Sequence, residues 1–93
     1  MFVGILQIEL LLRGNTSLKG KRQILKSVKD RVRHKFNVSI AEIDNNDLWQ
    51  RSTLGICCVS NDKTHTNRML SEVVNFIETN SAAELLDYSI EIL

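Results

Sequence analysis

Five basic side chains have a spacing that could bind a row of phosphate groups. They recur every three or four positions, which places neighbours along one face of a helix. They are Lys19, Arg22, Lys26, Lys29 and Arg33. Lys and Arg contacts to phosphate release counterions and strengthen attachment to nucleic acid without reading its base sequence. Together with Lys21 and Lys35 of the same segment, they are the residues we expect to contact RNA. A solvated helix face without a partner is the alternative explanation.

The charge of the chain is strongly uneven, although its net value is only +1. Residues 1–41 contain nine basic and two acidic side chains, a net charge of +7, whereas residues 42–93 contain three basic and nine acidic ones, a net charge of −6. A basic half of this kind favours binding to polyanions. It also permits a second hypothesis, a protein-interaction or self-assembling module in which the basic half of one copy meets the acidic half of another.

The only tryptophan lies in the segment Asp47-Leu48-Trp49-Gln50-Arg51, which we expect to form a loop. A loop tryptophan either closes the end of a sheet as a hydrophobic plug or anchors a partner molecule or a nucleic-acid base. We prefer the plug interpretation. Trp49, Gln50 and Arg51 nevertheless form a candidate partner contact, because a cation follows the aromatic residue closely.

The chain offers little for catalysis. It contains no Ser/His/Asp or Cys/His arrangement with supporting neighbours. The run Arg13-Gly14-Asn15 resembles only faintly the anion-binding loop of acylphosphatases, and the residues that surround their catalytic arginine are missing. We therefore expect no enzymatic activity and no cofactor, and an acylphosphatase-like enzyme acting on small anions is the third hypothesis.

The cysteines and histidines predict neither a disulfide nor a metal site. Cys57 and Cys58 are adjacent, and neighbouring side chains of an extended strand point to opposite faces. His34 and His65 are far apart and form no ligand pair with the cysteines at a zinc spacing. Polar residues interrupt the apolar start of the chain, which therefore predicts neither a signal peptide nor a membrane span. We expect a cytoplasmic protein.

The elements that must position these side chains follow from the periodicity of apolar residues. The expected strands are residues 2–13, 38–43, 53–60 and 84–93, and the expected helices are residues 17–35 and 63–79. The apolar stripe of the first helix consists of Leu18, Leu25, Val28, Val32 and Phe36. The order β-α-β-β-α-β with right-handed crossovers predicts one α+β domain, residues 1–93. Its architecture is the ferredoxin-like sandwich, a four-stranded antiparallel sheet with both helices on one face.

The sheet face without helices is poorly suited to RNA. Its expected members are Val3, Ile5, Gln7, Glu9, Asp87, Ser89 and Glu91. They include acids and no aromatic residue on which a base could stack, so we expect RNA on the helix side or at loops. Val3 and Ile5 could instead pack against another subunit of a homo-oligomer. On the opposite side of the last strand, the expected apolar residues are Leu86, Tyr88, Ile90 and Ile92.

Several segments together resemble the YlxP-like family of small bacterial proteins. They are residues 17–22 (SLKGKR), 36–39 (FNVS) with 41–42 (AE), 47–51 (DLWQR) and 59–62 (VSND). The resemblance extends from end to end and implies a ferredoxin-like fold, in a family that is a domain of unknown function. Members are commonly encoded beside translation initiation and ribosome-maturation factors, which implies a role with RNA or the ribosome.

One departure from the family concerns the start of the first helix. Members often carry an acidic residue where this chain has Gly20, three positions after Ser17, and that acid would complete a capping box. A glycine in a helix costs up to about 1 kcal/mol relative to alanine, so we expect a weak first turn. The missing carboxylate also leaves this turn more positive.

The expected function is that of a non-enzymatic RNA- or ribosome-associated protein, acting in ribosome maturation or translation.

Overall fold

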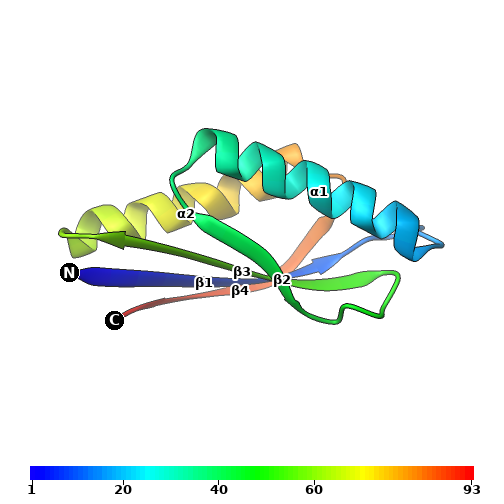
Figure 1. The fold of residues 1–93 in the computed structure, drawn as a ribbon, viewed down its shortest axis with the longest axis horizontal. Helices are drawn as coiled ribbons and strands as arrows, with labels where there is room; N and C mark the ends of the chain where they lie inside the picture. Colours follow the sequence, from blue (N-terminus) through cyan, green and yellow to red (C-terminus); the bar gives the residue numbers. More distant parts are fainter.

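Two helices and four strands make up the fold, and the computed structural model describes all of the chain, residues 1–93. In chain order the elements are β1 (Phe2–Leu11), α1 (Leu18–Lys35), β2 (Ser39–Asp44), β3 (Arg51–Ser60), α2 (Lys63–Asn80) and β4 (Glu84–Ile92). The strands form one antiparallel sheet in the order β2-β3-β1-β4. Both helices lie on the same side of this sheet, and its other face is uncovered (Figure 1). The predicted ferredoxin-like α+β fold is confirmed.

The core lies between the sheet and the two helices. Alternate residues of β1, among them Leu6, Ile8 and Leu10, point toward the helices and are fully buried. They meet the apolar stripes of both helices, for example Val32 of α1 and Leu70 of α2, in a cluster of 16 buried residues. Complete burial of such a side chain contributes about 1.5–3 kcal/mol, so this cluster fixes how α1 sits on the sheet. Neither helix is apolar over enough of its length to cross a membrane.

The two flanks of α1 face different neighbours. α1 lies over β2, and α2 lies over β1 and β4 (Figure 1). The guanidinium of Arg33 donates to the backbone oxygen of Ile40 in β2 across 3.0 Å. Two residues earlier, Arg31 donates to the backbone oxygen of Asn80 at the end of α2 across 2.9 Å. One flank of α1 is therefore turned toward β2, an edge strand, and the other toward α2.

A register shift in β4 corrects the predicted pattern of that strand. Glu9 pairs with Asp87, but the next residue, Leu10, pairs with Leu85, so Leu86 is an extra residue. Such a bulge interrupts the alternation of side chains between the two faces. Leu85 consequently packs against the core, whereas Leu86 is 41% exposed. The prediction that Leu86 lies on the core side with the later apolar residues of the strand is wrong.

The uncovered sheet face has the membership that the alternation predicted. Ile5 pairs with Glu91, Gln7 with Ser89 and Glu9 with Asp87, which places these pairs on one face. On the β3 side, Val3 pairs with Val59 and Ile5 with Cys57. Val3 and Ile5 are half-buried in the chain itself, and Val59 is the more exposed residue of this group at 65%. Self-association through this face stays a prediction.

The two cysteines lie on opposite faces of β3, as their adjacency predicted. Cys58 opposes Gly4 on the helix side and is buried, whereas Cys57 opposes Ile5 on the uncovered side and is exposed. Both thiols are free. Burial raises the pKa of the Cys58 thiol, because the thiolate loses its hydration there. Cys58 is therefore expected to behave as an inert core residue.

Candidate nucleic-acid interface

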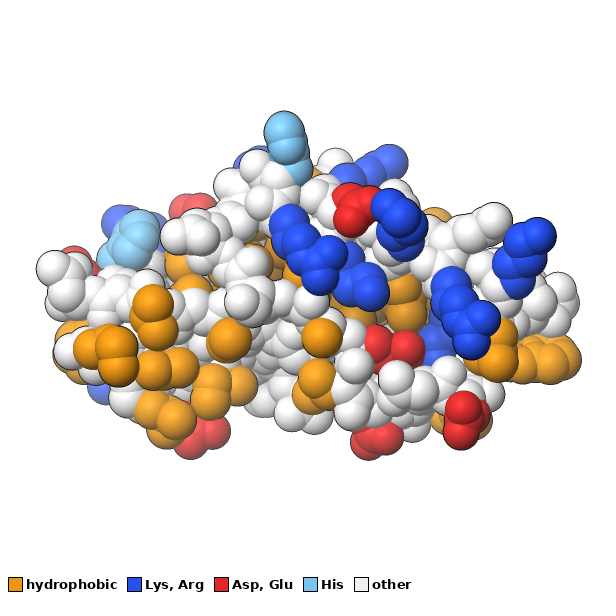
Figure 2. Space-filling model, in the orientation of Figure 1, with side chains coloured by type: hydrophobic (Ala, Val, Ile, Leu, Met, Phe, Trp, Pro, Cys, Tyr) orange, Lys and Arg blue, Asp and Glu red, His pale blue; other side chains and the backbone are white.

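Five of the predicted phosphate contacts share one flank of α1. They are Lys19, Arg22, Lys26, Lys29 and Arg33, and together we call them the basic flank. Because Arg33 reaches β2, this flank is the one turned away from α2 and toward the edge of the sheet. Four of the five side chains are exposed, and Lys29 is half-buried. Figure 2 shows Lys and Arg side chains distributed along α1 on this side of the molecule.

The basic flank keeps most of its positive charge. Its acidic neighbour within α1 is Asp30, whose carboxylate is 2.6 Å from the Lys26 ammonium and 3.9 Å from the Arg33 guanidinium. The hydrogen bond from Lys26 lowers the pKa of Asp30 against the opposing effect of desolvation, and the charges of Lys26, Arg33 and Lys29 lower it further. The other three cations of the flank form no ion pair. One acid of α1 therefore opposes five cations.

Lys35 lies apart from the basic flank. Its ammonium is 4.9 Å from the ring centre of Phe76 in α2 and 5.9 Å from that of Phe36. A cation over an aromatic face is attracted by the quadrupole of the ring. The two rings pack edge to face, with centroids 5.7 Å apart. Lys35 thus belongs to the contact between the two helices, and the structure does not bring it together with the five cations of the flank.

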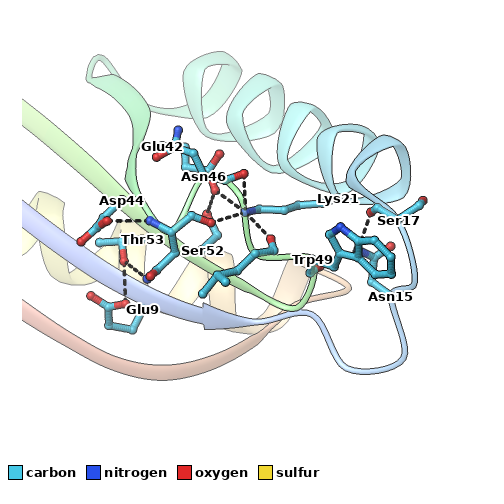
Figure 3. Close-up of polar contacts among 12 residues, drawn as sticks. Glu9, Asn15, Ser17, Lys21, Glu42, Asp44, Asn46, Trp49, Ser52 and Thr53 are labelled. Carbon is cyan, nitrogen blue, oxygen red and sulfur yellow. Dashed lines mark hydrogen bonds and ion pairs between the residues drawn. The ribbon is translucent and has the colours of Figure 1, made fainter.

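Lys21 is buried, so the prediction that it contacts phosphate is wrong. Its side chain is only 2% exposed, and its ammonium forms an ion pair with Glu42 at 2.8 Å. The same ammonium donates to the backbone oxygens of Asn45 at 2.6 Å and Leu48 at 2.7 Å. A lysine ammonium has three N–H donors, and these three partners occupy them (Figure 3). No donor of Lys21 remains for a ligand.

Glu42, the acidic partner of Lys21, is half-buried, and charge spacing along the sequence did not reveal this pair. Its Oε2 accepts from Lys21 and, across 2.7 Å, from Ser52 Oγ. Moving charges out of water is costly unless hydrogen-bond partners replace the water, and no buried side-chain nitrogen or oxygen lacks a partner. One signal could have revealed Lys21. The apolar stripe of α1 skips from Leu18 to Leu25, and Lys21 fills the missing step.

The connection between β2 and β3, residues 45–50, is tied to the start of α1, and we call it the Trp49 loop. The side-chain amide of Asn15 donates to the backbone oxygen of Trp49 at 2.6 Å and to that of Ser17 at 2.8 Å. Ser17 is the residue that caps α1. Lys21, one turn further along, binds backbone oxygens of the loop (Figure 3). Asn15, just before α1, and Lys21, in its second turn, therefore both hold the backbone of the loop.

Trp49 is 53% exposed, so the preferred interpretation of it as a buried plug is wrong. Its neighbour Leu48 is 48% exposed. Gln50 holds the loop instead of presenting its amide, because Nε2 donates to the backbone oxygen of Asn15 at 3.1 Å. The backbone oxygen of Gln50 also accepts from the amide of Leu12 at 2.8 Å. Gln50 is therefore a supporting residue, and Trp49 is the residue that the loop exposes.

Arg51 lies outside the Trp49 loop. It is the first residue of β3 and pairs with Leu11 of β1. Leu10 and Leu12 are buried on the helix side, so alternation places Leu11 and Arg51 on the uncovered face. Of the three residues predicted as a partner contact, Trp49 alone lies on the side of α1 with an exposed side chain that makes no hydrogen bond within the protein.

Gly20 is required by the way Asn15 packs. A Cβ at position 20 would overlap the side-chain oxygen of Asn15, and Asn15 cannot move without giving up its bonds to Ser17 and Trp49. The amide of Gly20 donates to the Ser17 side chain across 3.0 Å, which caps the first turn. An acidic residue at this position would need a different arrangement of Asn15.

This packing predicts that Gly20→Ala destabilises the protein although alanine is the better helix former. The helix propensity of alanine should contribute about 1 kcal/mol, but the loss of two hydrogen bonds at about 1 kcal/mol each outweighs it. We expect the free energy of unfolding in urea to fall by about 1 kcal/mol. In an Asn15→Ala background the same change should be stabilising, and a stabilising effect in the natural background would show that Asn15 moves freely.

Arg13 gives little support to the acylphosphatase hypothesis. Its guanidinium donates to Oε2 of Glu84, at the start of β4, across 2.9 Å. An anion bound at Arg13 would share the guanidinium with this carboxylate and be repelled by its charge. The ion pair is well exposed, so it contributes little to stability.

Comparison with known proteins identifies the family. Residues 3–90 match the family model described as "Protein of unknown function (DUF503)". The chain belongs to the DUF503 family. The DUF503 chain is also 42% identical over 77 residues to "Uncharacterized protein YlxP" of Bacillus subtilis (strain 168), an overlap of 83% of this chain and 84% of that protein. The resemblance to the YlxP-like family is confirmed.

Two solved structures similar to the DUF503 chain are designed proteins. The de novo designed protein Foldit4 superposes with a TM-score of 0.53 at 14% identity, covering 100% of this chain and 97% of that one. The de novo designed protein Ferredog-Diesel superposes with a TM-score of 0.46 at 16% identity, covering 96% and 83%. At such identities the likeness to Foldit4 concerns the fold alone.

Proposed function

We propose that the DUF503 chain is a non-enzymatic, RNA- or ribosome-associated protein that holds phosphate groups on the basic flank of α1. The observation that supports this most is the exposed line of five cations opposed by one acid of α1. Like charges three and four residues apart repel by a few tenths of a kcal/mol per pair, and bound phosphates relieve that repulsion. The flank therefore gains more from a polyanion than from water.

The surroundings of the flank favour the helix side as the site of binding. The uncovered sheet face carries Glu9, Asp87 and Glu91, whose charges repel phosphate. Family members are commonly encoded beside translation initiation and ribosome-maturation factors, which favours ribosomal RNA as the partner and ribosome maturation or translation as the process. Free thiols at Cys57 and Cys58 fit the reducing cytoplasm, where these processes occur.

The salt dependence of binding tests the proposal. The purified protein should bind ribosomal RNA or ribosomal subunits at about 50 mM salt and lose affinity steeply as salt rises. In the variant Lys26→Gln with Lys29→Gln, the slope of log K against log salt should become shallower by about 1.4 for a single strand, because two phosphate contacts are lost at about 0.7 each.

A matched control uses two exposed cations of α2, Lys63→Gln with Arg68→Gln, which removes the same charge. Its slope should equal that of the natural protein. No binding at low salt would overturn the proposal, and so would an equal change of slope in both variants, because binding would then depend on net charge and not on the basic flank.

A further inference from the structure

We propose that the Trp49 loop is a stacking platform for unpaired RNA bases at the end of the basic flank. The inference rests on the proposed function and adds the class of ligand, which is single-stranded RNA or an RNA loop and not a duplex. Trp49 would stack on a base while the cations of α1 hold the neighbouring phosphates.

The first support is that the backbone of the loop is fixed while the indole is exposed. Three consecutive carbonyl oxygens, those of Leu48, Trp49 and Gln50, accept hydrogen bonds from outside the loop. Their donors are the Lys21 ammonium, the Asn15 amide and the Leu12 backbone amide, at 2.7, 2.6 and 2.8 Å. The Trp49 side chain nonetheless remains 53% exposed. A ring on a fixed backbone loses less conformational freedom when a ligand binds, so more of the stacking energy is kept.

The second support is the position of the ring next to the cations. One Asn15 amide bridges the backbone oxygens of Trp49 and Ser17, so Trp49 lies beside the residue that caps α1 (Figure 3). The basic flank begins two residues after Ser17 with Lys19, and Arg22 follows one turn later. In Figure 2, hydrophobic side chains at the right-hand end of the molecule adjoin Lys and Arg side chains. From residue 19 to residue 33 the flank extends about 21 Å along the helix axis, so one strand could follow it and end at Trp49.

The third support is the division of charge between the two parts. Within residues 45–50 the one ionisable side chain is that of Asp47, which is acidic and exposed. Phosphates are therefore held by α1, and the loop contributes its apolar side chains, Trp49 and Leu48. Bases of a duplex are stacked on one another and cannot reach an aromatic side chain, whereas unpaired bases stack readily on Trp. The combination of an exposed indole with a cationic line selects an unpaired strand.

The test compares Trp49→Ala and Trp49→Phe with the natural protein, using a short unstructured RNA and a duplex of the same sequence. For the single strand, Trp49→Ala should lower affinity about 5- to 150-fold, the range expected for the loss of one stacked base. The slope against salt should not change, because no phosphate contact is lost. Trp49→Phe should retain most of the affinity, and duplex binding should be equal in all three proteins.

Two further measurements make the test independent of the alanine variant. Trp49 is the only tryptophan, so its fluorescence in the natural protein should be quenched by the single strand and not by the duplex. Tyr88→Ala is the matched control, because Tyr88 is 50% exposed on β4, on the other edge of the sheet, and it should bind like the natural protein.

The outcomes separate this inference from the proposed function. If salt-dependent binding persists and Trp49→Ala binds the single strand as well as the natural protein does, the platform is refuted and the phosphate-binding flank stands. If the natural protein binds no RNA at low salt, both proposals fail.

Discussion

Replacing Lys21 by methionine should lower the free energy of unfolding by about 3–5 kcal/mol, the usual cost of removing one partner from a buried ion pair. Methionine nearly matches the volume of the lysine stem but brings no donor. The Glu42 carboxylate, 17% exposed, would keep Ser52 as its side-chain donor, and the backbone oxygens of Asn45 and Leu48 would lose the ammonium. Urea denaturation monitored by circular dichroism measures the change.

Two further variants identify the cause of this loss. Lys19→Met alters an exposed cation of the same helix turn and should change stability by less than about 0.5 kcal/mol. Adding Glu42→Leu to Lys21→Met should recover part of the loss, because no unpaired charge is then left in the interior. If Lys21→Met were as stable as Lys19→Met, the ammonium would not be the group that holds the Trp49 loop.

Reversing two charges of the basic flank, Lys26→Glu with Lys29→Glu, should weaken RNA binding about 100-fold at low salt, which is ~1.4 kcal/mol for each reversed cation. The reversal replaces two attractions to phosphate by two repulsions. Stability should change by less than about 1 kcal/mol, because weaker repulsion among the flank cations offsets the loss of the exposed Lys26–Asp30 ion pair. Filter binding or fluorescence anisotropy with ribosomal RNA measures the affinity.

The control for this variant has the same net charge and a different location. Lys63→Glu with Arg68→Glu reverses two exposed cations of α2, so both variants change the net charge of +1 to −3. The α2 variant should lose less than tenfold, since only the long-range field of the protein changes. Equal losses in the two variants would mean that RNA responds to the net charge of the protein and that the flank is not an interface.

Much of the fold could be predicted because the spacing of apolar residues within each strand and helix shows which side is buried. Leu6, Ile8 and Leu10 alternate in β1, and Val28 and Val32 recur on one side of α1, so burial follows directly from the repeat of each element. The bulge at Leu86 could not be predicted this way, because it depends on how β4 pairs with β1. Local alternation contains no information on that pairing.

The candidate site was predictable to the extent that it lies on one helix. The spacing of the five flank cations already places them together, and the structure keeps them together. Lys21 has the same charge and lies in the same helix, yet its partners come from residues 42–48, which only the folded chain brings near it. Trp49 was misjudged for a similar reason, since the path of its loop depends on hydrogen bonds from Asn15 and Lys21, which only the folded chain brings near it.

The most direct measurement is a nuclear magnetic resonance titration of the isotope-labelled protein with a single-stranded fragment of ribosomal RNA at low salt. We predict that amide signals of α1 around the basic flank, signals of residues 45–50 and the indole N–H of Trp49 shift together. Signals of β4 and of the solvent side of α2 should stay in place. Shifts centred on the uncovered sheet face, or no shifts at all at low salt, would contradict this prediction.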